Sequence, residues 1–199
     1  DERRTGPRGD CDRRGARVGV CLPRTPDLVA TVLAILSIGA AYLPLDPAYP
    51  AERLRYMVED SAAPIVVTQR HLASLAREGT VLVTLDSVET PVAPQRARLD
   101  RAAASPEHLA YVIYTSGSTG LPKGGFQSQE NLLYHCDAYT GALSIGDDDV
   151  LTLLSTFSTD AAVVDFYSAL LKGGTVCPRD LRNVGLSGFV QYLRQNRVT

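Results

Sequence analysis

The chain has 199 residues, of which 45% are hydrophobic and 21% charged, and its formal net charge is −2. These values predict a folded domain with a sizeable core and exclude disorder over the whole length. They also give no attraction to nucleic acid or to an anionic membrane, so we expect neither as a partner. Residues 1–17 carry six arginines with acidic residues between them, and we interpret this stretch as a solvated lead-in.

From residue 17 onward, short apolar segments of strand character alternate with amphipathic segments of helical character. Strands are expected at 17–22, 41–45, 65–68, 80–85, 109–115, 150–154 and 175–177. Helices are expected at 26–38, 50–60, 71–77, 131–142, 160–171 and 186–194. The proline-containing stretch 87–106 is interpreted as a surface connection, and 116–125 as a loop.

One stretch, 28–45, has no charged residue and is nearly long enough to span a bilayer. It contains Gly39 and Pro44, and we therefore interpret it as a buried helix that runs into a buried strand. The cysteines are scattered, without the spacing of a zinc site, and no secretory signal is visible. Reduced structural thiols in a cytoplasmic protein are expected, and no metal ligands.

Alternation of strands and helices predicts an α/β fold, with a largely parallel sheet covered by helices on both faces. Ligands of such sheets bind at the carboxyl ends of strands. The loops that follow strands are therefore the places where functional residues are expected.

The loop SGSTGLPKG, residues 116–124, directly follows a predicted strand. Its glycines allow backbone N–H groups to form an anion-binding concavity, and its hydroxyl groups can donate to phosphate oxygens. Lys123 adds a positive charge, and Pro122 restrains the backbone before it. The candidate nucleotide-binding residues are Thr115, Ser116, Gly117, Ser118, Thr119, Gly120 and Lys123.

Two common phosphate-binding motifs do not fit this loop. The P-loop requires Ser or Thr after Gly-Lys, whereas here Gly124 follows Lys123. The dinucleotide motif G-x-G-x-x-G requires a glycine at position 119, where the chain has Thr119. A flexible Gly/Ser turn without a ligand remains the alternative.

Three segments resemble the adenylate-forming ligases. YTSGSTGLPKG is similar to the phosphate-loop motif of that family. The segment LAILSIGAAYLPLDPAYPAERLRYMVEDS, residues 33–61, is similar to amino-acid-activating adenylation domains of nonribosomal peptide synthetases. FSTDAAVVDFYSALLKGG, residues 157–174, resembles the motif in which an aspartate opens the substrate pocket. The fold implied is part of the large N-terminal subdomain, here residues 18–199.

The resemblance implies that a substrate carboxylate attacks the α-phosphate of Mg²⁺-bound ATP and releases pyrophosphate. A phosphopantetheine thiol on a carrier domain then takes the acyl group, so carrier domains and neighbouring synthetase modules are the implied partners. Lys123 would be the catalytic residue, because it would hold the departing phosphates. Asp160 would bind the α-ammonium group of an amino acid, and Ala161 and Val164 would line its side-chain pocket. From its position alone, Asp160 could also cap the following helix, with Thr159 sharing that role.

The sequence departs from the family pattern at Thr159, where phenylalanine is usual, and at Ala162 and Gln129, where serine and histidine are common. At these positions the resemblance does not determine the shape of the substrate pocket. The downstream family motifs for adenine, magnesium and ribose, and the C-terminal domain with its catalytic lysine, are absent from these 199 residues. We therefore expect an inactive fragment of an enzyme. A ligase for a non-amino carboxylic acid and a non-catalytic remnant remain alternatives.

Overall fold

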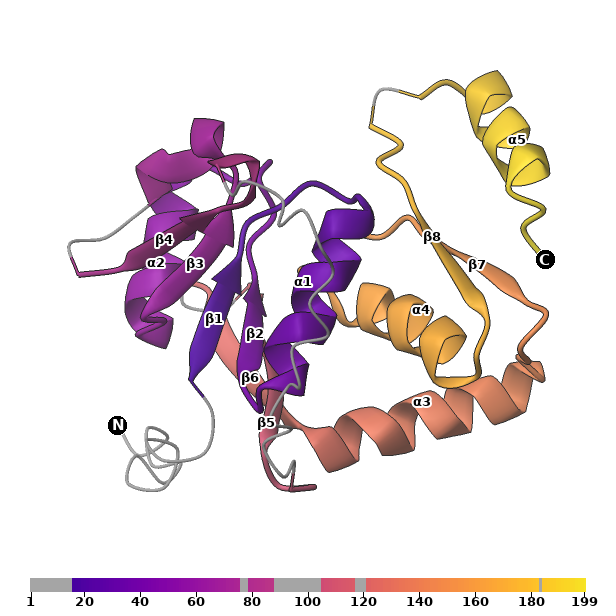
Figure 1. Ribbon diagram of the computed structural model, residues 1–199, viewed down its shortest axis with the longest axis horizontal. Helices are drawn as coiled ribbons and strands as arrows, with labels where there is room; N and C mark the ends of the chain where they lie inside the picture. Colours follow the sequence, from indigo (N-terminus) through magenta and orange to yellow (C-terminus); the bar gives the residue numbers. More distant parts are fainter. Residues whose placement is uncertain (1–15, 76–78, 88–104, 117–120, 183) are drawn as a thin grey trace.

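The computed structural model of the chain describes residues 16–75, 79–87, 105–116, 121–182 and 184–199 (Figure 1). Its main feature is a six-stranded sheet with the strand order β4-β3-β1-β2-β5-β6. All neighbouring strands are parallel except β5 and β6, which form an antiparallel pair. The strands are β1 (Arg17–Val20), β2 (Ala41–Pro44), β3 (Ile65–Thr68), β4 (Val81–Thr84), β5 (Leu109–Thr115) and β6 (Lys123–Ser128).

A second, two-stranded parallel sheet consists of β7 (Val150–Leu153) and β8 (Thr175–Pro178). The α-helices are α1 (Pro26–Ser37), α2 (Ala51–Ser61), α3 (Gln129–Leu143), α4 (Asp160–Leu171) and α5 (Leu186–Gln195). Two short 3₁₀ helices, η2 (Arg70–Leu75) and η3 (Leu85–Ser87), flank β4. Figure 1 shows α4 between α3 and the β7–β8 pair, while α5 lies at the far end of the chain.

The large sheet has a separate hydrophobic core on each face. Side chains of α2, including Leu54 and Met57, pack with Leu43 and Val112 on one face. Side chains of α1, α3 and α4 pack on the other face. Neighbouring residues of a strand point to opposite faces of the sheet. The central strands have apolar residues at consecutive positions, so both of their faces are apolar, as expected for a covered parallel sheet.

Aromatic side chains connect the large sheet to the segment that leads into α4. The ring of Tyr42 in β2 lies 5.5 Å from the ring of Phe157 and 5.6 Å from that of Tyr111, between centroids. Phe157 in turn contacts Phe166 of α4, edge to face, at 5.5 Å. These rings are buried, so the segment before α4 and the middle of α4 are packed against β2 and β5.

The predicted α/β class with a largely parallel sheet is confirmed. The apolar stretch 28–45 forms most of α1 and all of β2, and Gly39 between them has the left-handed φ of 76°. In the described part of the chain, no helix is long and apolar enough to cross a membrane. Most of the predicted connection 87–106, and all of the lead-in up to residue 15, lie outside the described residues.

One predicted element was partly wrong, and another was refined. The loop predicted at 116–125 is shorter, because its last three residues begin β6, which pairs with β5. Two glycines and no apolar alternation at the start of β6 hid this strand. The short helix predicted at 71–77 is the 3₁₀ helix η2 as far as Leu75, and residues 76 and 77 lie outside the described residues. Strand β6 is therefore set by its pairing with β5.

Candidate functional site

A cavity of about 480 Å³ lies where β2 and β5 end and α4 begins. We name it the strand-end cavity. Three predicted site residues line it together: Thr115, Ser116 and Asp160. Residues that the sequence analysis did not assign to a site also line it: Tyr49, Arg53, Tyr111, Gln127 and Ser158. The cavity thus joins the start of the predicted phosphate loop to the predicted substrate carboxylate.

The predicted phosphate loop lies in the sequence between β5 and β6, which pair as antiparallel neighbours. Thr115 is the last residue of β5, and Lys123, the first of β6, stands opposite it in the ladder. Residues 117–120, which include four of the predicted nucleotide-binding residues, lie outside the described residues. Lys123 is exposed and does not line the strand-end cavity. The predicted contact of Lys123 with phosphates would therefore be made from the start of β6 and not from the cavity wall.

Helix α2 holds the hairpin in place. The hydroxyl group of Tyr56 donates to the carbonyl oxygen of Pro122 at 3.2 Å, one residue before Lys123. The hydroxyl group of Tyr114 donates to Asp60 at 2.7 Å. Gly124 is packed so closely that a Cβ atom there would lie 3.2 Å from the Tyr114 ring. A side chain at position 124 would therefore require the side chains of Tyr114 and Val112 to shift slightly.

Asp160 is the first residue of α4, and Thr159 is its N-cap. Thr159 makes no capping bond, because its hydroxyl group donates backward to the carbonyl oxygen of Thr156 at 2.8 Å. One carboxylate oxygen of Asp160 accepts the N–H of Ala161 at 2.9 Å. The Asp160 side chain thus provides an acceptor for one of the backbone N–H groups in the first turn of α4. It has no ion pair within the described residues.

Tyr111 is the aromatic neighbour of Asp160 in this cavity. Burial raises the pKa of the Tyr111 hydroxyl group, and the nearby Cys136 and Asp160 raise it further. Tyr111 therefore stays a neutral hydrogen-bonding group beside the carboxylate. Ala161 is exposed and Val164 is buried, and neither lines the strand-end cavity. Their assignment to a side-chain pocket stays a prediction.

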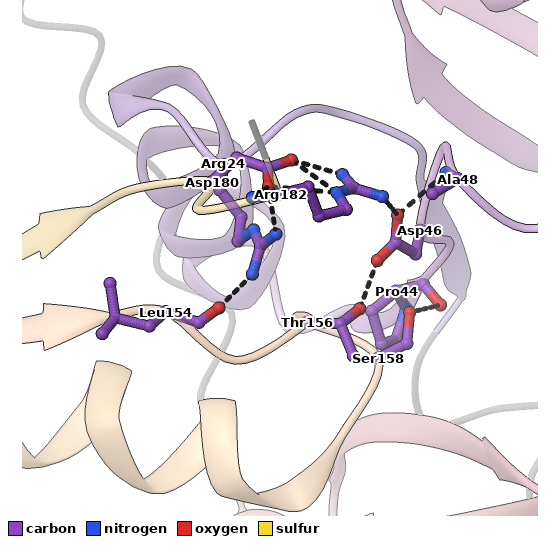
Figure 2. Close-up of polar contacts among 9 residues, drawn as sticks. All are labelled: Arg24, Pro44, Asp46, Ala48, Leu154, Thr156, Ser158, Asp180 and Arg182. Carbon is purple, nitrogen blue, oxygen red and sulfur yellow. Dashed lines mark hydrogen bonds and ion pairs between the residues drawn. The ribbon is translucent and has the colours of Figure 1, made fainter. Parts of the chain in front are cut away.

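A second polar group, the junction network, lies at the neighbouring strand ends (Figure 2). It consists of Arg24, Asp46, Thr156, Asp180 and Arg182, which follow β1, β2, β7 and β8. Arg24 contacts Asp180 at 2.9 Å, and Arg182 contacts Asp46 at 3.5 Å. Arg182 also binds Asp180 through its Nε at 2.9 Å. Asp46 accepts the hydroxyl group of Thr156.

The junction network holds the segment between β7 and α4 against the large sheet. Arg24 donates to the carbonyl oxygen of Leu154, and the hydroxyl group of Ser158 donates to that of Pro44 at 3.3 Å. The side chains of Arg24 and Asp46 are only 9% and 10% exposed. Because this segment leads directly into Asp160, the network sets where the Asp160 carboxylate meets the cavity.

The cysteines offer no reactive group in the described part of the chain. Cys21, Cys136 and Cys177 are free. Burial raises the pKa of Cys21 to about 12 and that of Cys136 to about 11, so both remain protonated thiols near neutral pH. Within the described residues, no group of three or more His, Cys, Asp or Glu side chains is placed to hold a metal ion.

Comparison with known proteins identifies the family to which the chain belongs. Residues 12–199 match the AMP-binding enzyme family. The chain belongs to the AMP-binding enzyme family. Among relatives of this family member, tyrocidine synthase 3 of Brevibacillus parabrevis is 41% identical over 157 residues, which are 79% of this chain and 2% of that synthetase. The chain therefore spans a very small part of that relative.

Solved structures of AMP-binding enzymes share its fold. The nonribosomal peptide synthetase FmoA3, solved with α-methyl-L-serine-AMP bound, matches 94% of this chain and 21% of its own with a TM-score of 0.79 and 29% identity. The N-terminal subdomain of NpsA from Klebsiella oxytoca matches 94% of this chain and 47% of its own with a TM-score of 0.76. At 21% identity, the second likeness shows the fold alone. It confirms the expected N-terminal subdomain fold of this family member.

Sequence reasoning missed Arg53 and Tyr49 as site residues, although both lie in the segment that carries the resemblance. Arg53 is at the third position of α2, which begins soon after β2 ends. Residues that follow a strand's carboxyl end are candidates for ligand binding in this fold. The same rule that selected the loop after β5 could therefore have selected the start of α2.

Proposed function

We propose that the chain contributes the phosphate loop and the substrate carboxylate of an amino-acid adenylation site in a nonribosomal peptide synthetase. The observation that carries the proposal is that Thr115, Ser116 and Asp160 line one cavity. An anion-binding loop and a carboxylate without an ion pair suit a substrate that brings phosphates and an ammonium group together. An aminoacyl adenylate has both groups.

In the proposed first step, the carboxylate oxygen of an amino acid attacks the α-phosphorus of ATP, and the bond to pyrophosphate breaks. Thr115, Ser116 and the loop residues 117–120 would bind phosphate oxygens, and Lys123 would stabilise the charge that develops on pyrophosphate. Asp160 would accept hydrogen bonds from the α-ammonium group. Residues 18–199 would thus supply the phosphate and ammonium subsites of the larger N-terminal subdomain.

In the proposed second step, a phosphopantetheine thiol of a carrier domain attacks the acyl carbon, and AMP leaves. The partners would be that carrier domain and neighbouring synthetase modules, in the cytoplasm. Mg²⁺ on the ATP phosphates would neutralise their charge, but the described residues provide no set of ligands for it. Support for the amino-acid class comes from the relatives and from the 29% identity with FmoA3.

The test is amino-acid-dependent exchange of labelled pyrophosphate into ATP, by a protein that carries this chain within an entire adenylation domain. We expect exchange with at least one amino acid. Exchange that requires a non-amino carboxylic acid instead would identify the alternative ligase, and no exchange with either class would identify a non-catalytic remnant. The isolated 199-residue chain is expected to show none, because the family's adenine and ribose motifs are absent from it.

A further inference from the structure

Arg53 places a cation on the wall of the strand-end cavity, beside the start of the phosphate loop. It belongs to the first turn of α2, and it lines the cavity together with Thr115, Ser116 and Asp160. Arg53 has no ion pair within the described residues, and Asp160 is farther from it than an ion pair allows. The cavity therefore presents a positive and a negative group that do not neutralise each other by direct contact.

The Arg53 side chain is held by stacking rather than by an acceptor. Its guanidinium carbon lies 4.2 Å from the centre of the Tyr49 ring, a cation–π contact. Its Nε is buried and has no hydrogen-bond partner in the described part of the chain. Buried donors in folded proteins are nearly always paired, and a charged donor without an acceptor is especially costly. An anionic ligand in the cavity would provide that acceptor.

The neighbours of Arg53 select a phosphate as this anion. Thr115 and Ser116 offer hydroxyl donors, and a guanidinium group matches two oxygens of a phosphate with parallel hydrogen bonds. The Asp160 carboxylate repels an anion on its side of the cavity. We infer that Arg53 binds a phosphate group of ATP, at a subsite formed with Thr115 and Ser116, while Asp160 faces the ammonium group. This inference rests on the proposed function and adds a residue to it.

The test compares Arg53→Gln with Arg55→Gln in a protein that carries this chain within an entire adenylation domain. Arg55 lies on the same helix, is exposed and has no ion pair or hydrogen bond within the described residues. Arg53→Gln is expected to raise the KM for ATP about 10-fold or more, as for a lost charge-assisted contact, and to leave the KM for the amino acid unchanged. Arg55→Gln is expected to behave as the unmodified protein.

A direct binding measurement separates this inference from the proposed function. Titration calorimetry with ATP alone should show about 10-fold weaker binding to Arg53→Gln even if no amino acid supports exchange. Arg53→Lys keeps the charge but not the planar fork, so about 3-fold weaker binding is expected, and this variant serves if Arg53→Gln does not fold. Unchanged ATP binding in the folded variants, or a higher KM for the amino acid alone, would overturn the phosphate subsite.

Discussion

The junction network and the strand-end cavity both lie at the carboxyl ends of strands, yet their charges are arranged differently. In the junction network, Arg24 and Arg182 are paired with Asp180 and Asp46. In the cavity, Arg53 and Asp160 have no ion pair among the described residues. Charged groups that are paired within the chain hold it together, whereas those without a partner are suited to a ligand. Position at strand ends alone therefore does not identify a binding residue, and a charged group that lines a cavity without an ion pair is the better candidate.

Removing a paired charge should cost stability, and Arg24→Met should show the largest effect. Arg24 is 9% exposed, contacts Asp180 and donates to the carbonyl oxygen of Leu154. The substitution leaves both acceptors with one partner fewer, so we expect a loss of about 3 kcal/mol in the free energy of unfolding. Urea unfolding followed by circular dichroism measures it. Arg55→Met, at an exposed position, should change stability by no more than about 0.5 kcal/mol, and an equal loss in both variants would contradict the structural role.

Removing a charge from the hairpin should cost activity instead. Lys123 is exposed and has no ion pair within the described residues. We expect Lys123→Ala to lower kcat/KM for ATP. The corresponding loss of transition-state stabilisation is about 1–3 kcal/mol, because a cation on the departing phosphates is lost. Its unfolding midpoint should not move. Unchanged pyrophosphate exchange at both limiting and saturating ATP would remove Lys123 from the proposed mechanism.

The pH dependence of stability should report the junction network with a smaller effect. The side-chain hydrogen bond from Arg182, with help from Arg24, lowers the pKa of Asp180 below its ordinary value. Stability from this carboxylate is present above the ordinary aspartate pKa of about 4, and it is lost as the pH falls through the lower folded value. As the pH is lowered, the unfolding midpoint of Asp180→Asn should therefore fall less steeply than that of the unmodified protein. Parallel curves for the two proteins would show that Asp180 does not contribute.

Sequence periodicity was sufficient for most of the fold and for part of the site. The amphipathic pattern of α2 and the apolar strands β3 and β5 are local signals, and their positions were predicted within a residue. Strand β6 was missed because its pairing with β5, not its own composition, makes it a strand. The junction network was missed for a similar reason, since ion pairs such as Arg24 with Asp180 join residues far apart in the sequence.

The site residues divide in the same way. The predicted phosphate loop was proposed from local glycine, hydroxyl and lysine spacing, whereas the substrate role of Asp160 came from the resemblance to adenylation domains. Arg53 could not be distinguished from Arg55 by sequence, because both are arginines on one amphipathic helix. Only the packing of Arg53 against Tyr49 and the shared cavity separates them.

The substrate role of Asp160 can be measured as a single ratio. The measurement is the ratio of kcat/KM for an amino acid to that for its des-amino analogue, before and after Asp160→Asn in a protein that carries this chain within an entire adenylation domain. Asparagine keeps the size of the side chain and caps a helix almost as well as aspartate, but it lacks the charge. We predict that the ratio falls about 10- to 100-fold, the scale of a lost charge-assisted contact, with little change for the analogue. A ratio that does not move would leave Asp160 as a helix-end residue and contradict the amino-acid assignment.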